Sequence, residues 1–355
     1  MEAVIIAGGF GSRLRPLTDR RPKHLLPVAG VPFLVHQLTK LAAAGVGHVV
    51  LATSYRATEF RPVLGDGSDF DLALSYLHEP EPLGTGGAIR NAAAALRTGA
   101  SDQPVVVLNG DTLSGHDIAA QVVAFAATDA DLSLHLVAVA DPRPFGCVVT
   151  DASGRVMEFA EKSPRPLSSQ INAGCYVFRR EIMTDIAPGR VVSVERETFP
   201  EMLRRGRRVV AHLESAYWLD VGTPATLVQA STDLVRGIAT STAYRHPPAD
   251  RLVHETATVD EAAVITGGSV IGRGATVSAG AVVDGSVLLP CVRIDSDAQL
   301  VASAVGEGAR IGAGSQVHEA VVGDEAVIGA GCVLMPGVRI GCGAVIADGT
   351  QAGAD

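Results

Sequence analysis

A six-residue periodicity in the C-terminal third restricts the possible folds of this chain more than any other feature. Apolar residues recur there at every sixth position, with small or polar residues between them. They are Ile271, Val277 and Val283, then Val305, Ile311 and Val317, then Ile328, Leu334, Ile340 and Ile346. This pattern predicts a left-handed parallel β-helix of roughly five coils, each a triangle of three short strands. The pattern breaks between Leu288 and Ser303, where we expect a loop or an irregular coil.

The residues before the repeat alternate between strand and helix patterns. Val4–Ala7, His48–Ala52 and Val105–Leu108 are apolar runs typical of buried parallel strands. Helical spacing is found between them, over Pro32–Ala44 and Gly86–Arg97. We therefore predict an α/β fold, with a doubly wound, Rossmann-like domain followed by the β-helix.

The length of 355 residues is enough for two domains that each bury a core. Periodicity is lost after a predicted helix over Pro224–Arg236, and two adjacent prolines follow at 247 and 248. We predict a first domain at 1–236, a linker at 237–250 and the β-helix at 251–355. A chain cut after residue 237 is expected to lose assembly more than chemistry.

A glycine-rich turn follows the first predicted strand. Gly8, Gly9 and Gly11 leave backbone N–H groups open to a ligand, and Arg13 and Lys23 add fixed positive charge nearby. This combination predicts a site for phosphate groups. The turn is neither the G-x-G-x-x-G dinucleotide fingerprint nor a G-K-[ST] phosphate loop.

A carboxylate stands at the end of another predicted strand. Asp111 lies in an Asn-Gly-Asp turn, and Ser114, assisted by Asp117, is the better expected cap for the helix that follows. Asp111 is therefore expected to point into a cleft at the carboxyl edge of the sheet. Asp220, considered by itself, fits either a turn residue or a second site carboxylate.

Charge and hydropathy exclude several classes of function. The net charge of −9 opposes a general affinity for nucleic acid. We see no charged-then-apolar leader and no apolar run as long as a membrane span, so the expected setting is cytoplasmic, with no membrane partner.

Two stretches near the N-terminus carry a family resemblance. GG-x-G-S-R-L-R-P-L-T followed by R-P-K-x-L-L-P-V resembles the signature of sugar-1-phosphate nucleotidyltransferases, and the whole chain looks most like the mannose-1-phosphate guanylyltransferases. The resemblance implies an enzyme that transfers a guanylyl group from GTP to a sugar 1-phosphate, releasing pyrophosphate. It implies catalytic roles for Arg13, Lys23 and Lys162, and a magnesium ion held by Asp111 and Asp220.

The same resemblance assigns the binding residues. Nucleotide contacts are implied for Gly8, Gly9, Gly11, Glu79, Gly84 and Thr85, and sugar-phosphate contacts for Gly146, Glu161, Lys162 and Asn172. Glu79 is expected to read guanine, because an ionised carboxylate accepts hydrogen bonds from the two adjacent donors of that base. The alternative is that Glu79 is an ordinary solvated residue.

Several alternatives remain open at this point. Gly86–Gly87 resembles heptose-1-phosphate enzymes more than mannose enzymes, so a heptose 1-phosphate, or a cyclitol phosphate such as valienol 1-phosphate, could replace mannose 1-phosphate. Another NTP and a non-catalytic regulatory homologue are further possibilities. An acyltransferase would need a base such as His254 or His318 in the repeat. The open coil ends and flat faces of a β-helix favour a homo-oligomer, at least a dimer.

Overall fold

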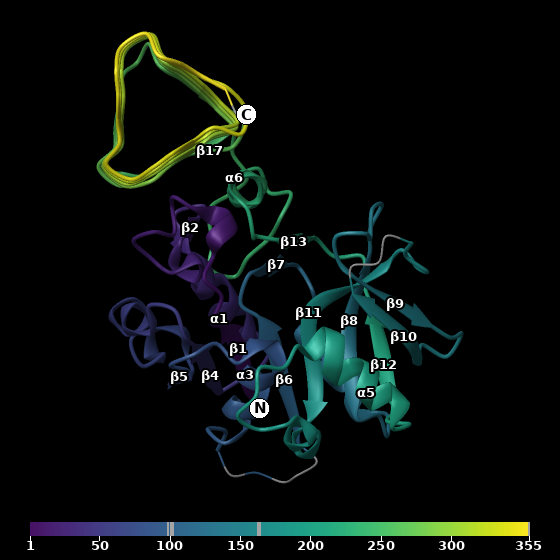
Figure 1. Cartoon of the computed structure of the whole chain (residues 1–355). Helices are drawn as coiled ribbons and strands as arrows, with labels where there is room; N and C mark the ends of the chain where they lie inside the picture. The colour runs from purple at the N-terminus through teal and green to yellow at the C-terminus, as the bar shows by residue number, and fades with distance from the viewer. Residues whose placement is uncertain (98, 100–102, 162–164, 354–355) are drawn as a thin grey trace. The chain divides into compact units, whose positions relative to one another are not determined.

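The computed structural model describes residues 1–97, 99, 103–161 and 165–353 (Figure 1). Its contacts divide the chain into two compact units. The first comprises Met1–Gly9 and Gln37–Trp218, and the second comprises Phe10–His36 and Leu219–Asp355. The loop that follows Gly9 therefore belongs with the C-terminal repeat. The boundaries 1–236, 237–250 and 251–355 remain a prediction about domain order along the chain.

A nine-stranded mixed sheet forms the centre of the first unit. β1 (Glu2–Ala7) lies between β4 (His48–Thr53) and β6 (Pro104–Asn109), and β5 (Ala73–His78) follows β4, all in parallel. The remaining strands are β8 (Leu132–Ala138), β9 (Gly146–Thr150), β10 (Val156–Glu161), β11 (Gln170–Arg179) and β12 (Val209–Leu213). β11 runs antiparallel to β6 and adds β9 and β8 to the sheet.

The helices between these strands agree with the predicted alternation. α1 (Phe33–Ala43) and α3 (Gly84–Ala93) match the two helices expected from spacing, although α3 begins and ends earlier. α2 (Phe60–Leu64), α4 (Ile118–Ala126) and α5 (Phe199–Arg204) are the others described. The doubly wound fold is confirmed.

The predicted cap of α4 is wrong. Ser114 lies in the short strand β7 (Thr112–Ser114), where its Oγ accepts the N–H of His116. The N-cap is Asp117, whose side chain accepts the N–H of Ala120 at 2.9 Å. The carboxylate is closer to the helix start and accepts more strongly than a hydroxyl, so it takes the role that we gave to Ser114.

The repeat forms three parallel sheets of six strands each, which are the sides of a triangular coil (Figure 1). One side comprises β14 (Arg251–Val253), β17 (Ser269–Ile271), β20 (Val287–Leu288), β23 (Ala304–Val305), β26 (Val321–Val322) and β29 (Arg339–Ile340). The second comprises β15 (Thr258–Val259), β18 (Thr276–Val277), β21 (Arg293–Ile294), β24 (Arg310–Ile311), β27 (Val327–Ile328) and β30 (Val345–Ile346). The third comprises β16 (Val264–Thr266), β19 (Val282–Asp284), β22 (Gln299–Val301), β25 (Gln316–His318), β28 (Val333–Leu334) and β31 (Gln351–Ala352). The β-helix is confirmed, with six strands a side where we expected roughly five coils.

The loop predicted between Leu288 and Ser303 is wrong. That stretch forms β20, β21 and β22, and Leu288 stacks between Ile271 and Val305. Equivalent residues here are 17 positions apart, as in the bond from Ser303 N to Ser286 Oγ. One corner of the coil is thus a residue shorter than three repeats of six, which shifts the apolar pattern without ending the strands.

Helix α6 (Pro224–Val235) packs on the first side of the β-helix, next to β17. Thr223 caps it, and Pro224 begins it as predicted. Val270 and Val287 point away from the coil interior yet are 3% and 2% exposed, so this side of the β-helix is covered.

The remaining strands are short: β2 (Pro27–Val28) and β3 (Val31–Pro32), which form a hairpin, and β13 (Trp218–Asp220). Among the described residues, no helix is both long and apolar enough to cross a membrane.

Candidate functional site

Three predicted site residues, together with Ser54, follow the carboxyl ends of adjacent parallel strands in the first unit. Gly8 follows β1, Ser54 follows β4, Glu79 follows β5, and Asp111 comes two residues after β6. The Ser54 hydroxyl donates to the Gly8 carbonyl at 2.6 Å, and the N–H of Glu79 donates to the Thr53 carbonyl at 2.8 Å. Doubly wound sheets bind ligands at this edge.

The turn that carries Asp111 is held from two sides. The Gln37 amide donates to the carbonyls of Asn109 at 2.9 Å and Thr112 at 3.1 Å. Gly174 lies against the same turn with φ +77°, and a Cβ there would be 3.0 Å from Asn109 Nδ2. These braces fix the backbone on both sides of Asp111, whose side chain is partly exposed. Helical spacing alone gave no reason to single out Gln37.

Glu79 is buried, at 3% exposure, so it is not an ordinary solvated residue. Its carboxylate accepts the N–H of Leu83 at 3.4 Å and the Asn91 amide at 3.5 Å. Burial raises the pKa of Glu79, and those two donors oppose the rise. The side chain is therefore oriented by the N-cap residue of α3, Leu83, and by Asn91 near the end of that helix. Its contact with a base stays a prediction.

The Gly84–Thr85 segment has close contacts of its own. Gly84 has φ +73°, and a Cβ there would be 2.6 Å from the Val192 carbonyl oxygen. The Thr85 hydroxyl donates to Glu195 at 2.8 Å and accepts the N–H of Val194 at 2.8 Å. Packing against this segment explains the residue types at both positions, so their role toward a nucleotide also stays a prediction.

The sugar-phosphate residues lie on three neighbouring strands of the first unit. Gly146 pairs with Glu161 across β9 and β10, and Ile171, next to Asn172, pairs with Cys147 across β11 and β9. Asn172 donates to the Tyr176 hydroxyl at 2.8 Å and accepts the N–H of Gly174 at 3.1 Å. Lys162 lies outside the described residues. The turn from Asp151 to Gly154 that joins β9 to β10 is confirmed.

The predicted catalytic cations Arg13 and Lys23 belong to the second unit. Arg13 Nη2 is 3.8 Å from Asp220 Oδ2, with the two side chains 65% and 30% exposed. Gly222 makes this approach possible, because a Cβ there would lie 2.5 Å from Arg13 Nη2. Gly11, with φ +64°, lies under Lys23 in the same way, since its Cβ would be 2.9 Å from Lys23 Cβ. Sequence reasoning identified Arg13, Lys23 and Asp220 but missed Gly222.

A second group of ligating side chains lies elsewhere in the first unit. His116, His135 and Glu214 approach one another closely, and Glu214 accepts from His116 Nδ1. The two imidazole rings stack 3.7 Å apart at 13°, so their lone pairs lie in nearly parallel planes and do not converge on one ion. Burial lowers the pKa of His135 to about 2, which keeps it neutral. We interpret the two histidines as buried, neutral side chains with a structural role and not as metal ligands.

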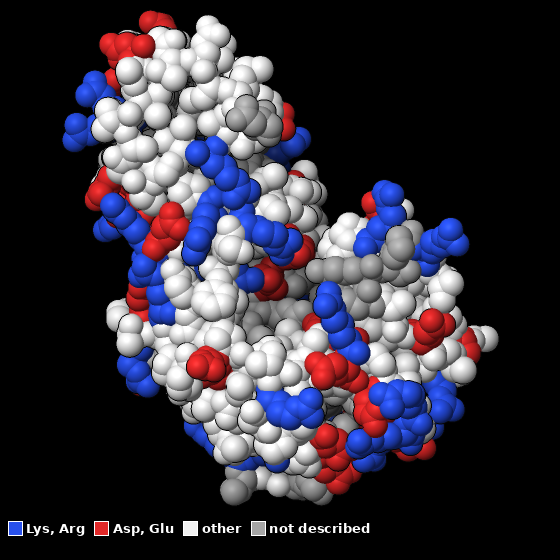
Figure 2. All heavy atoms as spheres, in the orientation of Figure 1, with Lys and Arg blue, Asp and Glu red and all other residues white. Residues whose placement is uncertain are grey.

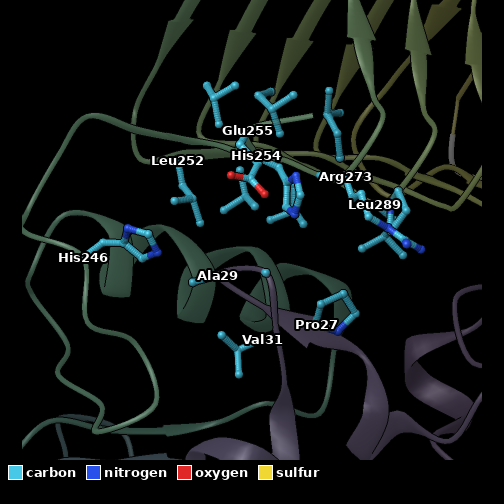
Figure 3. Close-up of a pocket in the computed structure, with 17 residues that line it drawn as sticks. Pro27, Ala29, Val31, His246, Leu252, His254, Glu255, Arg273 and Leu289 are labelled. Atoms are coloured by element: carbon cyan, nitrogen blue, oxygen red, sulfur yellow. The ribbon is translucent and has the colours of Figure 1, made fainter. Parts of the chain in front are cut away.

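The second unit also contains a hollow of about 540 Å³ (Figure 3). Pro27 and Val31 of the β2–β3 hairpin line one wall, and Leu252 and Leu289 of the β-helix line the other. His254 lines it as well, and its Nδ1 accepts the N–H of Thr256 at 3.2 Å. The hollow leaves the hairpin incompletely packed on the first coils.

Charges of both signs are interspersed on the face shown in Figure 2. Lys and Arg side chains stand beside Asp and Glu side chains on this face. Ion pairs of this kind include Arg20 and Glu325, which lie 2.6 Å apart. The net charge of −9 is thus compatible with local binding of anions.

Comparisons with known proteins agree on one family. Residues 2–237 match the nucleotidyl transferase family, and residues 249–328 match the GMPPB C-terminal domain. The chain is 46% identical to a mannose-1-phosphate guanylyltransferase of Mycobacterium tuberculosis, over 98% of this chain and 96% of that protein. It is 32% identical to mannose-1-phosphate guanylyltransferase 1 of Arabidopsis thaliana, over 86% of each. HddC from Yersinia pseudotuberculosis, solved with GMP-PN, matches with a TM-score of 0.55 and 30% identity, over 65% of this chain and 97% of that one.

Proposed function

The chain belongs to the nucleotidyl transferase family, and we propose that it transfers the guanylyl group of GTP to mannose 1-phosphate, giving GDP-mannose and pyrophosphate. The observation that carries this proposal is the pairing of Arg13, in the loop after the glycine turn, with Asp220 of β13, where a cation and a carboxylate lie 3.8 Å apart. The names of the relatives, at 46% and 32% identity, support mannose 1-phosphate as the acceptor.

The reaction is an in-line displacement at the α-phosphorus of GTP. A phosphate oxygen of the sugar 1-phosphate forms the new P–O bond, and the bond to pyrophosphate breaks. Gly8, Gly9 and Gly11 let backbone N–H groups approach the triphosphate, while Arg13 and Lys23 neutralise charge that develops on it. Lys162 would align the attacking phosphate.

Gly146, Glu161 and Asn172 would orient the sugar, since their strands are neighbours in one sheet. Glu79, Gly84 and Thr85 would form the base side of the site. Catalysis then rests on positioning and charge neutralisation, with no covalent enzyme intermediate.

Asp111 and Asp220 are suited to hold Mg²⁺. Both side chains are partly exposed carboxylates, and Mg²⁺ prefers oxygen ligands while keeping several waters. When bound, the ion would supply positive charge to the phosphates of both substrates. The pairing of the two aspartates at one ion is part of the proposal.

One assay tests the function. The protein is incubated with each NTP and with mannose, heptose and cyclitol 1-phosphates, with and without Mg²⁺, and pyrophosphate release is followed. GTP with mannose 1-phosphate should be the fastest pair. A heptose 1-phosphate is the second candidate, because the Gly86–Gly87 pair resembles heptose-1-phosphate enzymes more than mannose enzymes. Faster pyrophosphate release with the heptose substrate would replace mannose 1-phosphate in the proposal.

We further propose a cytoplasmic homo-oligomer, at least a dimer, which light scattering would test.

A further inference from the structure

Hydrogen bonds from the later coils of the β-helix anchor the loop that carries Arg13. Arg339, on β29, donates from Nη1 to the carbonyl of Arg13 and to the carbonyl of Arg15, each at 2.8 Å. These carbonyls lie on either side of Leu14, which is 1% exposed. One guanidinium thus fixes the backbone on both sides of a core residue, including the backbone of Arg13 itself.

A second attachment lies a few residues further along the same loop. Arg21 donates to Asp324 at 2.7 Å and to Glu307 at 3.0 Å. The side chain of Asp324 is only 2% exposed, and its other oxygen accepts the N–H of Glu307 at 2.9 Å. Such a buried, fully bonded acid fixes the geometry of its partner, because leaving either group unpaired is costly.

These contacts fall on one side of the β-helix, on or just after β23, β26 and β29. The hollow of Figure 3 lies at the other end of that side, under the hairpin and against β14, β17 and β20. The hairpin therefore has incomplete support beneath it, while the loop before it is held by charged groups on the later coils.

We propose that Arg339 is a positioning residue for the reaction: by holding the two carbonyls around Leu14, it keeps the Arg13 guanidinium in place beside Asp220. This inference rests on the proposed function for its kinetic readout. The β-helix would thus serve the chemistry directly, as the support of the phosphate-binding loop.

Arg310 provides a matched control. It lies on β24, on another side of the β-helix, where it is exposed and precedes an isoleucine as Arg339 does. Its side chain donates to Asp295 of the β-helix at 3.0 and 2.8 Å, so among the described residues its hydrogen bonds stay within the β-helix and do not reach the Arg13 loop. Arg310→Ala should therefore remove a similar charge and leave turnover unchanged.

The test compares wild type, Arg339→Ala, Arg339→Lys and Arg310→Ala in full-length protein. Arg339→Ala should lower kcat about 10- to 100-fold, because displacing a catalytic group by about 1 Å costs on that order, with KM for the sugar phosphate within about twofold. Arg339→Lys should recover part of kcat, since an ammonium can still donate to one carbonyl. Hydrogen exchange, measured by mass spectrometry, should become faster in peptides covering residues 10–17 and stay unchanged over residues 251–330.

Wild-type kcat in Arg339→Ala would overturn the inference. So would faster exchange across the whole β-helix, because the arginine would then act through general stability. If wild type released no pyrophosphate with any substrate pair, the proposed function would fail by itself, and the exchange of residues 10–17 would still decide whether Arg339 holds the loop.

Discussion

Gly222→Ala should displace the Arg13 side chain while leaving the stability of the fold nearly unchanged. The ideal Cβ of an alanine there would lie 2.5 Å from Arg13 Nη2 and 3.0 Å from Asp220 Oδ1. Ordinary contacts between heavy atoms are about 3.5 Å or longer, so the guanidinium would have to retreat by about 1 Å. The present Arg13–Asp220 separation of 3.8 Å would lengthen accordingly.

The fold should tolerate this change. The φ of Gly222 lies outside the left-handed region, so alanine can adopt its backbone conformation. The atoms in the way are the ends of side chains, and that of Arg13 is 65% exposed and can move. The lower entropy of the unfolded alanine chain offsets part of the clash, by about 0.4 to 1 kcal/mol. We expect a change in unfolding free energy of less than about 1 kcal/mol.

Activity should fall much more than stability. A shift of about 1 Å in a catalytic group costs on the order of 100-fold, which corresponds to about 2.7 kcal/mol of transition-state stabilisation. Gly222→Ala should therefore lower kcat about 10- to 100-fold in the pyrophosphate assay. Thermal unfolding measures the stability of the variant. Gly47→Ala is the control, because a Cβ at Gly47 would meet no atom within 4 Å. Wild-type kcat in Gly222→Ala would refute the role given to Arg13.

Other changes test the remaining assignments. Asp111→Asn and Asp220→Asn should each abolish Mg²⁺-dependent turnover while circular dichroism stays that of wild type; retained activity in either would remove that residue from the metal site. Glu79→Gln should reduce the preference for GTP over ATP and UTP more than it slows turnover with GTP, whereas Glu81→Gln should change neither. Full GTP selectivity in Glu79→Gln would contradict the role of Glu79 in recognising guanine. Burial lowers the pKa of His36 from 6.5 to about 4, so the folded state resists its protonation and loses up to about 3 kcal/mol as pH falls from 6.5 to 4. Urea unfolding of His36→Gln should show a weaker dependence on pH across that window, and an equal dependence would contradict the assignment.

Local patterns were sufficient to predict most of the fold. The apolar runs at Val4–Ala7 and Val105–Leu108 became neighbouring parallel strands, because residues buried on both faces leave few alternatives to a central strand. The hexapeptide repeat predicted the β-helix for a similar reason, since each apolar residue must point into the coil. The errors came where a single residue decides the outcome, as at the short corner before Leu288 and at the cap of α4.

The candidate site was only partly predictable, since its supporting contacts join residues far apart in the sequence. Arg13 and Lys23 could be identified from the glycine turn beside them. Gln37, which braces the Asp111 turn, is 72 positions from Asn109, and nothing in its neighbours marks it. Glu79 was assigned to the base, but its burial and its bonds to Leu83 and Asn91 depend on the packing of α3.

The organisation of the second unit changes what the β-helix is expected to contribute. Along the chain, the proposed catalytic residues all precede residue 237, which suggested that the repeat serves assembly. Arg339 nevertheless reaches the carbonyl of Arg13 across 326 positions, and Arg21 reaches Asp324 across 303. A chain cut after residue 237 would keep Arg13 and Lys23 and lose the groups that hold their loop. Because catalysis by charge neutralisation depends on the placement of those cations, the contacts argue that truncation would cost chemistry as well as assembly.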